Sequence, residues 1–344
     1  MGAELKIGLV GCGAHAGSHV RGLLGARDSV AVTAVCDLDP ERAALRGAEL
    51  AAARVYADYE AFLGEADVDG VLLCLPHRTH APATIAAARA GKHVLVEKPI
   101  TTSLADANAM IEAADSAGVT LMVAHNQRFF PEHQRVRALL DEGAIGTIYC
   151  ARADHNQEFL PPGSHWIRRR EEAGGGATMG YGVHRIDLLR WLVGEIAQVA
   201  HFQHAAPDRR SGFEGETSAV TIFTFANGAI GEMAINWTAR RPPWMDMLYL
   251  YGDQGSIHNV GGLFVDSRRH SGALDGVVKV DVPDADPFAE QIRHFAACVL
   301  NGTEPLTSGA DARKTLEVCL AAYESARTGQ VIRLPLPTAN QAPT

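Results

Sequence analysis

The chain has 344 residues, of which 47% are hydrophobic and 21% are charged. This length accommodates about two domains of ordinary size, and the composition excludes both a disordered chain and a disulfide-stapled miniprotein. The formal net charge is −9 at pH 7, and the densest basic cluster, residues 168–170, is followed at once by two glutamates. An acidic chain of this kind repels phosphate backbones, so we expect no nucleic acid as a partner.

From residue 5 to residue 124, short β-rich runs alternate with alanine-rich helical stretches. This alternation is typical of βαβ units around a parallel sheet. It predicts strands at residues 6–10, 31–36, 70–73, 93–96 and 120–124, and helices at residues 17–26, 40–52, 81–90 and 104–117. We expect an α/β fold in which residues 1–124 form a doubly wound Rossmann domain that binds a dinucleotide.

Beyond residue 125 the pattern changes to longer alternating runs. Asn227-Gly228 joins two of them, at residues 219–225 and 229–237, and this dipeptide is the strongest short-range signal for a β-hairpin. Further strands are predicted at residues 247–252, 256–259 and 277–282, with helices near residues 288–300 and 311–327. These elements predict a second, α+β domain over residues 125–344 with an antiparallel-rich sheet.

Six cysteines occur without a C-x-x-C pair, and most of them lie in apolar runs where a thiol behaves as a small hydrophobic side chain. This pattern favours a reducing compartment. No apolar stretch approaches the roughly 18 residues that a membrane span needs, and the chain opens directly into a strand-like segment. We therefore expect a cytoplasmic protein without a membrane partner.

The first predicted strand runs into a G-x-G-x-x-A element at the start of the first predicted helix. In such a turn the first glycine permits a tight bend and the second lets the backbone approach a pyrophosphate, while the helix N-terminus offers unpaired N–H groups to the anion. Without a cofactor, the same glycines would merely close a βα turn. The predicted cofactor contacts in this element are Gly11, Gly13, Ala14, His15 and Ala16.

Asp37 ends the second predicted strand, 21 residues after Ala16. A carboxylate there can accept hydrogen bonds from both ribose hydroxyls of an adenosine, and it repels the 2′-phosphate of NADP. No arginine directly follows it. The sequence therefore predicts NAD as the cofactor in preference to NADP, the alternative role for Asp37 being a cap of the next helix.

The strand at residues 93–96 ends in Glu97-Lys98-Pro99. Open α/β sheets bind ligands at the carboxyl ends of their parallel strands. A lysine there can donate to a substrate oxygen near the nicotinamide, and it titrates near neutrality when it is partly desolvated. On spacing alone, a surface ion pair in front of a helix-starting proline fits these residues equally well.

Together with Gly174-Gly175-Gly176 and the later G-V-H-R-I-D segment at residues 182–187, these motifs resemble the Gfo/Idh/MocA oxidoreductases. The resemblance extends along nearly the whole chain, and the combination of Glu-Lys-Pro with the later Gly-x-His-x-x-Asp is specific. It implies that the second domain is built on a large, mostly antiparallel sheet, which binds substrate and packs subunits into a homodimer or homotetramer. It also implies that Lys98 is the active-site lysine and His184 the acid/base histidine, although an isolated histidine in this position is equally compatible with a buried core role.

The resemblance assigns further residues to the site. It places the loop of residues 74–80 beside the nicotinamide, residues 126–129 between the domains, and residues 166–168 at the border of the sugar site, where Arg168 is alternatively a solvated charge. His77 and His80 lack a carboxylate or cysteine ligand at useful spacing, so no metal is predicted. The implied cofactor contacts are Leu75, Pro76, His80, Glu97, Lys98 and Arg128, and the implied substrate contacts are Lys98, His155, Trp166, Arg168, Tyr181 and His184.

The chain departs from the family pattern at one position. Many sugar and cyclitol dehydrogenases of the family carry an aspartate four residues before the histidine, where this sequence has Gly180. On a helix, residues 180 and 184 share a face, so that aspartate would contact substrate and raise the basicity of the histidine. Three hypotheses follow: Tyr181 takes over the polar contact, a residue of a strand at 154–158 does so, or the vacated space admits a larger substrate.

These residues predict an NAD-dependent oxidoreductase that transfers a hydride between the nicotinamide and a hydroxyl or keto carbon. The expected substrate is a sugar, a sugar derivative or a cyclitol. Two alternatives stay open, namely an enzyme that retains NAD and uses transient sugar oxidation to break a glycosidic bond, and a dinucleotide-binding sensor without turnover.

Overall fold

The computed structural model describes residues 4–159, 161–163, 165–205, 212–268 and 276–337. The chain divides into two compact units. The first contains Met1–Phe130 and Asp284–Arg313, and the second contains Pro131–Pro283 and Lys314–Thr344. The predicted division, 1–124 and 125–344, differs from this one because residues 284–313 return to the first unit.

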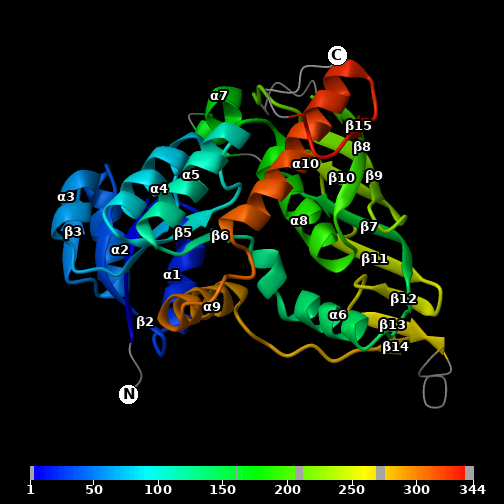
Figure 1. Cartoon of the computed structure of the whole chain (residues 1–344), viewed down its shortest axis with the longest axis horizontal. Helices are drawn as coiled ribbons and strands as arrows, with labels where there is room; N and C mark the ends of the chain where they lie inside the picture. Colours follow the sequence, from blue (N-terminus) through cyan, green and yellow to red (C-terminus); the bar gives the residue numbers. More distant parts are fainter. Residues whose placement is uncertain (1–3, 160, 164, 206–211, 269–275, 338–344) are drawn as a thin grey trace. The chain divides into compact units, whose positions relative to one another are not determined.

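The first unit is a doubly wound α/β structure around a six-stranded parallel sheet with the order β3-β2-β1-β4-β5-β6 (Figure 1). The predicted fold class is confirmed here, and the sequence missed only the short β3 and the helix α3. The strands are β1 (Leu5–Val10), β2 (Val30–Cys36), β3 (Arg54–Tyr56), β4 (Gly70–Leu73), β5 (His93–Glu97) and β6 (Leu121–Ala124). The helices between them are α1 (Ala16–Gly25), α2 (Pro40–Leu50), α3 (Tyr59–Glu65), α4 (His80–Arg89) and α5 (Leu104–Ala117).

Helix α9 (Pro287–Asn301) explains the changed domain boundary, since it packs against α1 in the first unit (Figure 1). Its apolar face, including Ile292 and Phe295, is fully buried in the same core cluster as Leu23 of α1. Gly22 permits this close approach, because a Cβ there would lie 2.6 Å from the Cβ of Phe288. Helical periodicity predicts α9 itself but carries no information about which sheet the helix covers.

The second unit holds a nine-stranded mixed sheet with the order β14-β13-β12-β11-β7-β10-β9-β8-β15. All its neighbouring strands are antiparallel except β7 and β10, and β9 and β10 form the hairpin predicted around Asn227-Gly228. The predicted strand at residues 277–282 is limited to the two residues of β14. The strands are β7 (Ile148–Asn156), β8 (Ile196–His204), β9 (Ser218–Phe225), β10 (Ile230–Asn236), β11 (Asp246–Gly252), β12 (Gly255–His258), β13 (Phe264–Ser267), β14 (Val278–Lys279) and β15 (Ile332–Arg333).

The two faces of this sheet differ in their environment. Helix α8 (Val183–Leu192) and the part of α10 (Gly309–Thr328) that belongs to this unit lie against strands β7–β10 (Figure 1), and the Ser325 hydroxyl accepts from the His201 amide at 3.0 Å. On the opposite face, large apolar side chains are exposed. They are Phe202, Val220, Ile222 and Ile230. Alternation along β9 and β10, together with the exposed Phe202 on β8, therefore gives the sheet one helix-covered face and one apolar, uncovered face.

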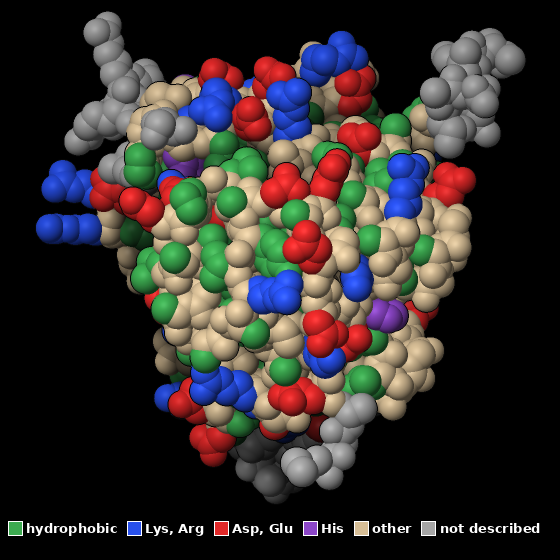
Figure 2. Space-filling model, turned by 90° about the vertical axis from the view of Figure 1, so that its left-hand side faces the viewer, with side chains coloured by type: hydrophobic (Ala, Val, Ile, Leu, Met, Phe, Trp, Pro, Cys, Tyr) green, Lys and Arg blue, Asp and Glu red, His purple; other side chains and the backbone are tan. Residues whose placement is uncertain are grey.

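The surface drawn in Figure 2 carries lysine and arginine side chains interspersed with aspartate and glutamate. Charges of the two signs alternate there instead of gathering into a single-sign patch. Among the described residues, no helix combines the length and the hydropathy needed to cross a membrane.

Candidate cofactor and substrate sites

The two glycines of the G-x-G turn have different structural demands. Gly11 has a φ of +89°, and a Cβ there would lie 2.2 Å from the carbonyl oxygen of Cys74, so the backbone itself requires glycine. Gly13 has no atom within 4 Å of the position where its Cβ would be. No residue that the structure describes explains this second glycine, and a bare backbone in front of the N-terminus of α1 fits a bound pyrophosphate.

Asp37 follows β2 and is held by two backbone amides. Its Oδ2 accepts from the Cys12 N–H at 2.6 Å, and its Oδ1 accepts from the Asp39 N–H at 2.8 Å. Each carboxylate oxygen retains a lone pair for a further donor. The carboxylate is therefore fixed beside the glycine turn in an arrangement that suits two ribose hydroxyls.

The other residues of the turn lead into a histidine–carboxylate cluster. His15, between Ala14 and Ala16, is the N-cap residue of α1, and its Nε2 lies 3.2 Å from Glu97 Oε1, while His19 Nε2 lies 2.7 Å from the same oxygen. Burial opposes ionisation, but the two imidazoles hold the pKa of Glu97 well below its usual value. Their ligand atoms lie within 4.8 Å of one another, a group with the composition of a metal site that the sequence did not predict.

Lys98 directly follows β5 and is half-buried. Burial lowers the pKa of its ammonium group, and the neighbouring Glu97 carboxylate opposes that change. The Lys98 amide donates to Glu97 Oε2 at 3.0 Å, and this bond restrains the carboxylate beside the start of the loop after β5. A lysine in this setting gives up a proton more readily than an exposed lysine does.

The loop after β4 also contributes the residues that the sequence predicted. Leu75 and Pro76 are half-buried, and the 3₁₀ turn His77–Thr79 follows them. His80 begins α4 and is fully buried, with ring nitrogens 2.8 Å from the Pro99 carbonyl oxygen and 2.9 Å from that of Leu75. The loops after β4 and β5 are thus joined through one imidazole.

Arg128, which the sequence predicts as a cofactor contact, makes contacts within the first unit. It lies in the 3₁₀ turn Asn126–Phe129 and is buried, and its guanidinium donates to the Leu306 carbonyl oxygen at 3.0 Å and pairs with Asp311 at 2.5 Å. These contacts join the two chain segments of the first unit, Met1–Phe130 and Asp284–Arg313. Arg128 therefore has a structural role, and its predicted contact with the cofactor stays a prediction.

In the second unit, His184 lies at the start of α8, directly after a π-helical turn formed by Thr178–Gly182. Single π turns are frequent at functional sites. The His184 side chain is buried, and its ring centroid lies 5.0 Å from that of Tyr181. The Tyr181 ring stacks on His155 with centroids 3.4 Å apart, so three of the predicted substrate residues form one cluster.

Two charged residues that the sequence did not identify support this cluster. Asp246, at the start of β11, lies 2.7 Å from His155 Nδ1 through its Oδ1, and the same oxygen accepts from the fully buried Arg185. Burial lowers the pKa of His155, and Asp246 opposes this. The network fixes the His155 ring against the face of Tyr181, and the Tyr181 ring is tilted by 60° relative to that of His184. Tyr181 and the β7 residue His155 thus lie where the first two hypotheses about Gly180 need a polar group, and their contact with substrate stays a prediction.

The third hypothesis about Gly180 is wrong, because the space beside this glycine is filled. A Cβ at Gly180 would lie 2.4 Å from Cη2 of Trp237, whose side chain is 1% exposed. The sequence analysis left Trp237 out of the site. Glycine at position 180 is thus matched to an indole in the core and does not enlarge the substrate space.

Trp166 and Arg168 lie in a 3₁₀ turn near the same helix. Ile167, between them, would lie 3.7 Å from a Cβ at Gly180, so the turn borders the π-helical segment. Arg168 donates through Nε to the carbonyl oxygens of Pro161 and Pro162 at 3.0 and 3.1 Å, and its guanidinium lies 5.1 Å from the Phe213 ring centroid. These contacts hold its own loop together, whereas Trp166 is half-buried beside it.

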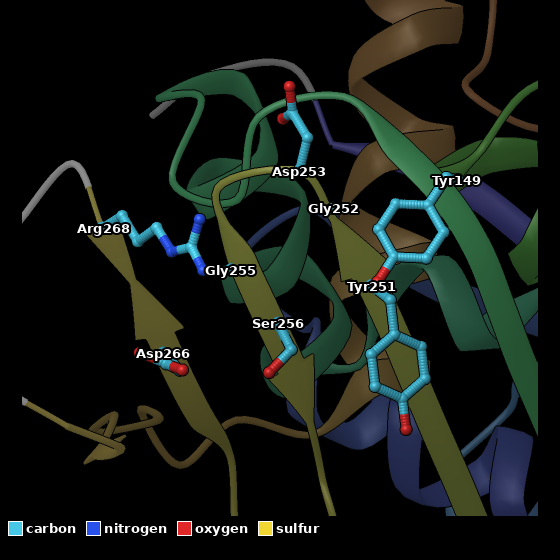
Figure 3. Close-up of a pocket in the computed structure, with 8 residues that line it drawn as sticks. All are labelled: Tyr149, Tyr251, Gly252, Asp253, Gly255, Ser256, Asp266 and Arg268. Carbon is cyan, nitrogen blue, oxygen red and sulfur yellow. The ribbon is translucent and has the colours of Figure 1, made fainter.

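A pocket of about 330 Å³ in the second unit is separate from these residues (Figure 3). It lies on strands β7 and β11–β13, where the rings of Tyr149 and Tyr251 lie side by side and Arg268 points toward Gly255. None of its lining residues belongs to the predicted site. The volume of a pocket alone would therefore have pointed away from His184.

Comparison with known proteins supplies the family. The family profile described as "Oxidoreductase family, NAD-binding Rossmann fold" matches residues 5–125, and the one described as "GFO/IDH/MocA C-terminal domain" matches residues 133–258. D-apiose dehydrogenase of Paraburkholderia graminis is 31% identical, over 96% of this chain and 90% of that protein. The chain belongs to the Gfo/Idh/MocA oxidoreductase family. Its first unit is accordingly an NAD-binding Rossmann domain, and the family predicted from the motifs is confirmed.

Other Gfo/Idh/MocA relatives match along the same length. Myo-inositol 2-dehydrogenase of Thermotoga maritima is 26% identical over 96% of this chain and 98% of that protein. A solved oxidoreductase from Agrobacterium radiobacter, in complex with NAD+, L-tartaric acid and magnesium, is 26% identical, covers 96% of this chain and 98% of its own, and has a TM-score of 0.87. The predicted Rossmann domain, the mostly antiparallel second sheet and the NAD cofactor agree with the family profiles and with the NAD+ complex.

The two glycines of the turn give a direct test of cofactor binding. We expect Gly13→Ala to unfold at the same urea concentration as the wild type but to bind NADH at least about 10-fold more weakly, because the added methyl meets only the cofactor. Gly11→Ala is expected to lose stability even without cofactor, since it forces a positive φ and a clash. Urea denaturation and NADH fluorescence titration of both variants measure the two effects separately. Unchanged NADH affinity in Gly13→Ala would contradict the assignment.

Proposed function

We propose that this protein is an NAD-dependent dehydrogenase of a polyhydroxylated substrate, namely a sugar, a sugar derivative or a cyclitol. The observation that carries the proposal is the buried cluster of His184, Tyr181 and His155 at a π-helical turn, in a chain whose other unit presents Lys98 beside an NAD-binding turn. Relatives named as dehydrogenases of D-apiose and of myo-inositol support the substrate class.

In the proposed reaction, His184 takes the proton of the substrate hydroxyl while the hydrogen on the same carbon departs as hydride. NAD+ supplies the hydride acceptor at nicotinamide C4. Lys98 donates a hydrogen bond to the substrate oxygen and stabilises the negative charge that develops there, and each such proton-handling group contributes about 10²-fold to 10⁴-fold in rate. Tyr181, held from below by His155 and Asp246, fixes the orientation of the His184 ring.

Turnover with a panel of polyols tests this function. Pentoses, hexoses, anhydrosugars, inositols and their keto forms are assayed with NAD and NADP separately by the absorbance of the reduced nicotinamide. We expect turnover of at least one compound, with NAD preferred because Asp37 repels a 2′-phosphate. NAD binding without turnover of any compound would instead favour the sensor. Tightly held NAD together with glycoside cleavage would favour the glycosidase-type enzyme. The relatives are named as dehydrogenases and reductases and favour neither alternative.

We also propose that the protein is a cytoplasmic homo-oligomer. The uncovered face of the nine-stranded sheet supports this, because Phe202 is 70% exposed and Val220, which lies opposite it on the adjacent strand, is 47% exposed. All six cysteines are thiols, which supports a reducing compartment. Light scattering of the wild type and of Phe202→Glu is expected to give a dimer or tetramer and a smaller species, respectively. A monomeric wild type would contradict the proposed oligomer. Recovery of the protein from an oxidising compartment on cell fractionation would contradict the proposed cytoplasmic location.

A further inference from the structure

The π-helical turn Thr178–Gly182 and α8 form one continuous helical segment, which carries His184. The first four amides of a helix have no partner within it. In this segment they are the amides of residues 176–179, because the first bond along the segment runs from the Gly180 amide to the Gly176 carbonyl oxygen at 2.9 Å. All four amides reach acceptors elsewhere in the second unit.

Glu216 supplies the acceptors for three of these amides. Its carboxylate accepts from the Gly176 amide through Oε2 at 3.1 Å and from the Thr178 amide through Oε1 at 2.8 Å, and its backbone carbonyl oxygen accepts from the Ala177 amide at 2.8 Å. The residue is 4% exposed, and the helix dipole stabilises a negative charge at the N-terminus of a helix. Glu216 is therefore an N-terminal cap that lies outside the helix and far along the chain from it.

Tyr323 of α10 supplies the acceptor for the fourth amide. Its hydroxyl accepts from the Met179 amide at 3.1 Å and from the Gly176 amide at 3.2 Å, and it donates to Glu216 Oε1 at 3.0 Å. A hydroxyl has one donor and two lone pairs, so these bonds use its whole capacity. Burial and the Glu216 carboxylate raise the pKa of Tyr323 well above its usual value, so the hydroxyl keeps the proton that it donates.

The glycines in front of the segment let these two residues approach its backbone. A Cβ at Gly175 would overlap the Tyr323 hydroxyl, and a Cβ at Gly176 would overlap the backbone of Glu216. Gly215 faces them from the other side, since a Cβ there would lie 2.6 Å from the Gly176 Cα. Two glycines of the Gly-Gly-Gly motif are thus the contact surface for the cap.

We propose that Glu216 and Tyr323 are positioning residues that fix the start of this helical segment and thereby place His184 for catalysis. Both act through the backbone of the π-helical turn. Tyr181 lies inside that turn and His184 directly follows it, so a change in the path of the turn moves both rings. The inference rests on the proposed function of His184 as the group that takes the substrate proton.

The cap matters more at this turn than at the start of an ordinary helix. A π turn closes its hydrogen bond over one more residue than an α-helical turn does, and it is rare. Loss of the extra residue would rotate the residues on its two sides relative to each other by about 100°, the step of one residue at 3.6 residues per turn. The cap holds the residues before the turn and burial of α8 holds those after it, so Tyr181 keeps its place beside His184.

Amide hydrogen exchange in the whole protein tests the cap without any substrate. In the wild type we expect the amides of residues 176–179 to exchange as slowly as those in the middle of α8, because each has an acceptor. Tyr323→Phe removes the hydroxyl and keeps the ring, so the Met179 amide should exchange at least about 10-fold faster while the middle of α8 is unchanged. Fast exchange of these amides in the wild type, or no acceleration in the variant, would overturn the proposal.

Kinetics and the NMR signal of the His184 ring then test the positioning role. We expect Tyr323→Phe and Glu216→Gln to lower kcat by about 10-fold to 100-fold with little change in NADH affinity, since a displaced catalytic group costs rate. The His184 ring signal, identified by its loss in His184→Gln, should move in both variants as Tyr181 shifts. An unmoved signal or wild-type kcat in a folded variant would show that the cap only stabilises the helix, which would overturn the positioning role. If no polyol is oxidised, the proposed function fails, while hydrogen exchange and the ring signal still decide the cap.

Two matched controls remove the same groups elsewhere. Tyr59→Phe removes a hydroxyl that donates to a carbonyl oxygen of α4 at 2.9 Å. Glu317→Gln changes a carboxylate of α10 that is 8% exposed and accepts from the Leu336 amide at 3.0 Å. We expect both controls to keep wild-type kcat and slow exchange at residues 176–179. A loss of kcat in either control as large as that in Tyr323→Phe would overturn the specific role of the cap.

Discussion

Replacement of Lys98 by alanine is expected to lower kcat by about 10³-fold while the NADH dissociation constant changes by less than about 3-fold. The side chain is the donor that we place on the substrate oxygen, and its loss leaves the charge that develops there without a partner. NADH affinity is expected to change little because the predicted pyrophosphate contacts come from the backbone of the turn after β1. Lys98 follows a different strand, β5, and contributes its side chain to the substrate. Steady-state kinetics and NADH titration on the same preparation measure the two quantities.

Lys6→Ala is a suitable control for the loss of a positive charge from the first unit. Lys6 forms an exposed ion pair with Asp67 at 2.7 Å, and solvent screens such a pair so that it contributes little to stability. This variant is expected to retain wild-type kcat. Full activity in Lys98→Ala would remove the lysine from the mechanism, and lost NADH binding would instead make it a cofactor residue.

The first unit was predicted closely because its elements are defined by local sequence. Strands β1, β4 and β5 are short buried apolar runs, and the helix α5 ends at Gly118 with a φ of +65°. Each of these signals depends on residues within one turn or one strand. The return of α9 to this unit depends on contacts between residues more than 260 positions apart, which no local pattern records.

The candidate site in the second unit was predicted only in part, for a related reason. The motif around His184 identifies the histidine. Tyr181 is predicted because it lies three residues before His184, and His155 because it lies in the strand expected at residues 154–158. Asp246 joins them from β11, 91 positions beyond His155. A charged residue acquires this role only through the pairing of β7 with β11, which hydrophobic periodicity does not specify.

The role of Trp237 was within reach of the sequence, although the analysis did not use it. Inward-facing positions alternate along β10, with Met233 and Ile235 buried, and the next inward position is Trp237. The glycines of the π-helical segment face the same row, since a Cβ at Gly182 would lie 3.3 Å from Met233 and a Cβ at Gly180 would meet Trp237. A tryptophan and a glycine in these two positions compensate each other in volume.

We expect Gly180→Asp to lower the free energy of unfolding by about 3 kcal/mol or more, because its Cβ would overlap the indole and its carboxylate would be buried. The distances from that Cβ to Cη2 and Cζ2 of Trp237 are 2.4 and 2.5 Å. The backbone fixes the Cβ and the indole is rigid, so a small side-chain rotation does not relieve this overlap. Restoring the family's aspartate alone therefore damages the protein and does not restore a function. Urea denaturation followed by circular dichroism measures the change.

The partner variant distinguishes a clash from a general intolerance of position 180. Trp237→Ala alone is expected to cost about 3–5 kcal/mol, and the double variant should be less destabilised than the sum of the two by about 2 kcal/mol, because the aspartate then occupies space that the indole has left. Gly64→Ala, at a helical glycine with no atom within 4 Å of its Cβ position, is the control and should be neutral or slightly stabilising. Strict additivity of the two changes would show that Trp237 is not what excludes the aspartate. A measured coupling would instead show that Trp237 excludes a carboxylate at position 180, so that the proposed support of His184 comes from Tyr181, His155 and Asp246.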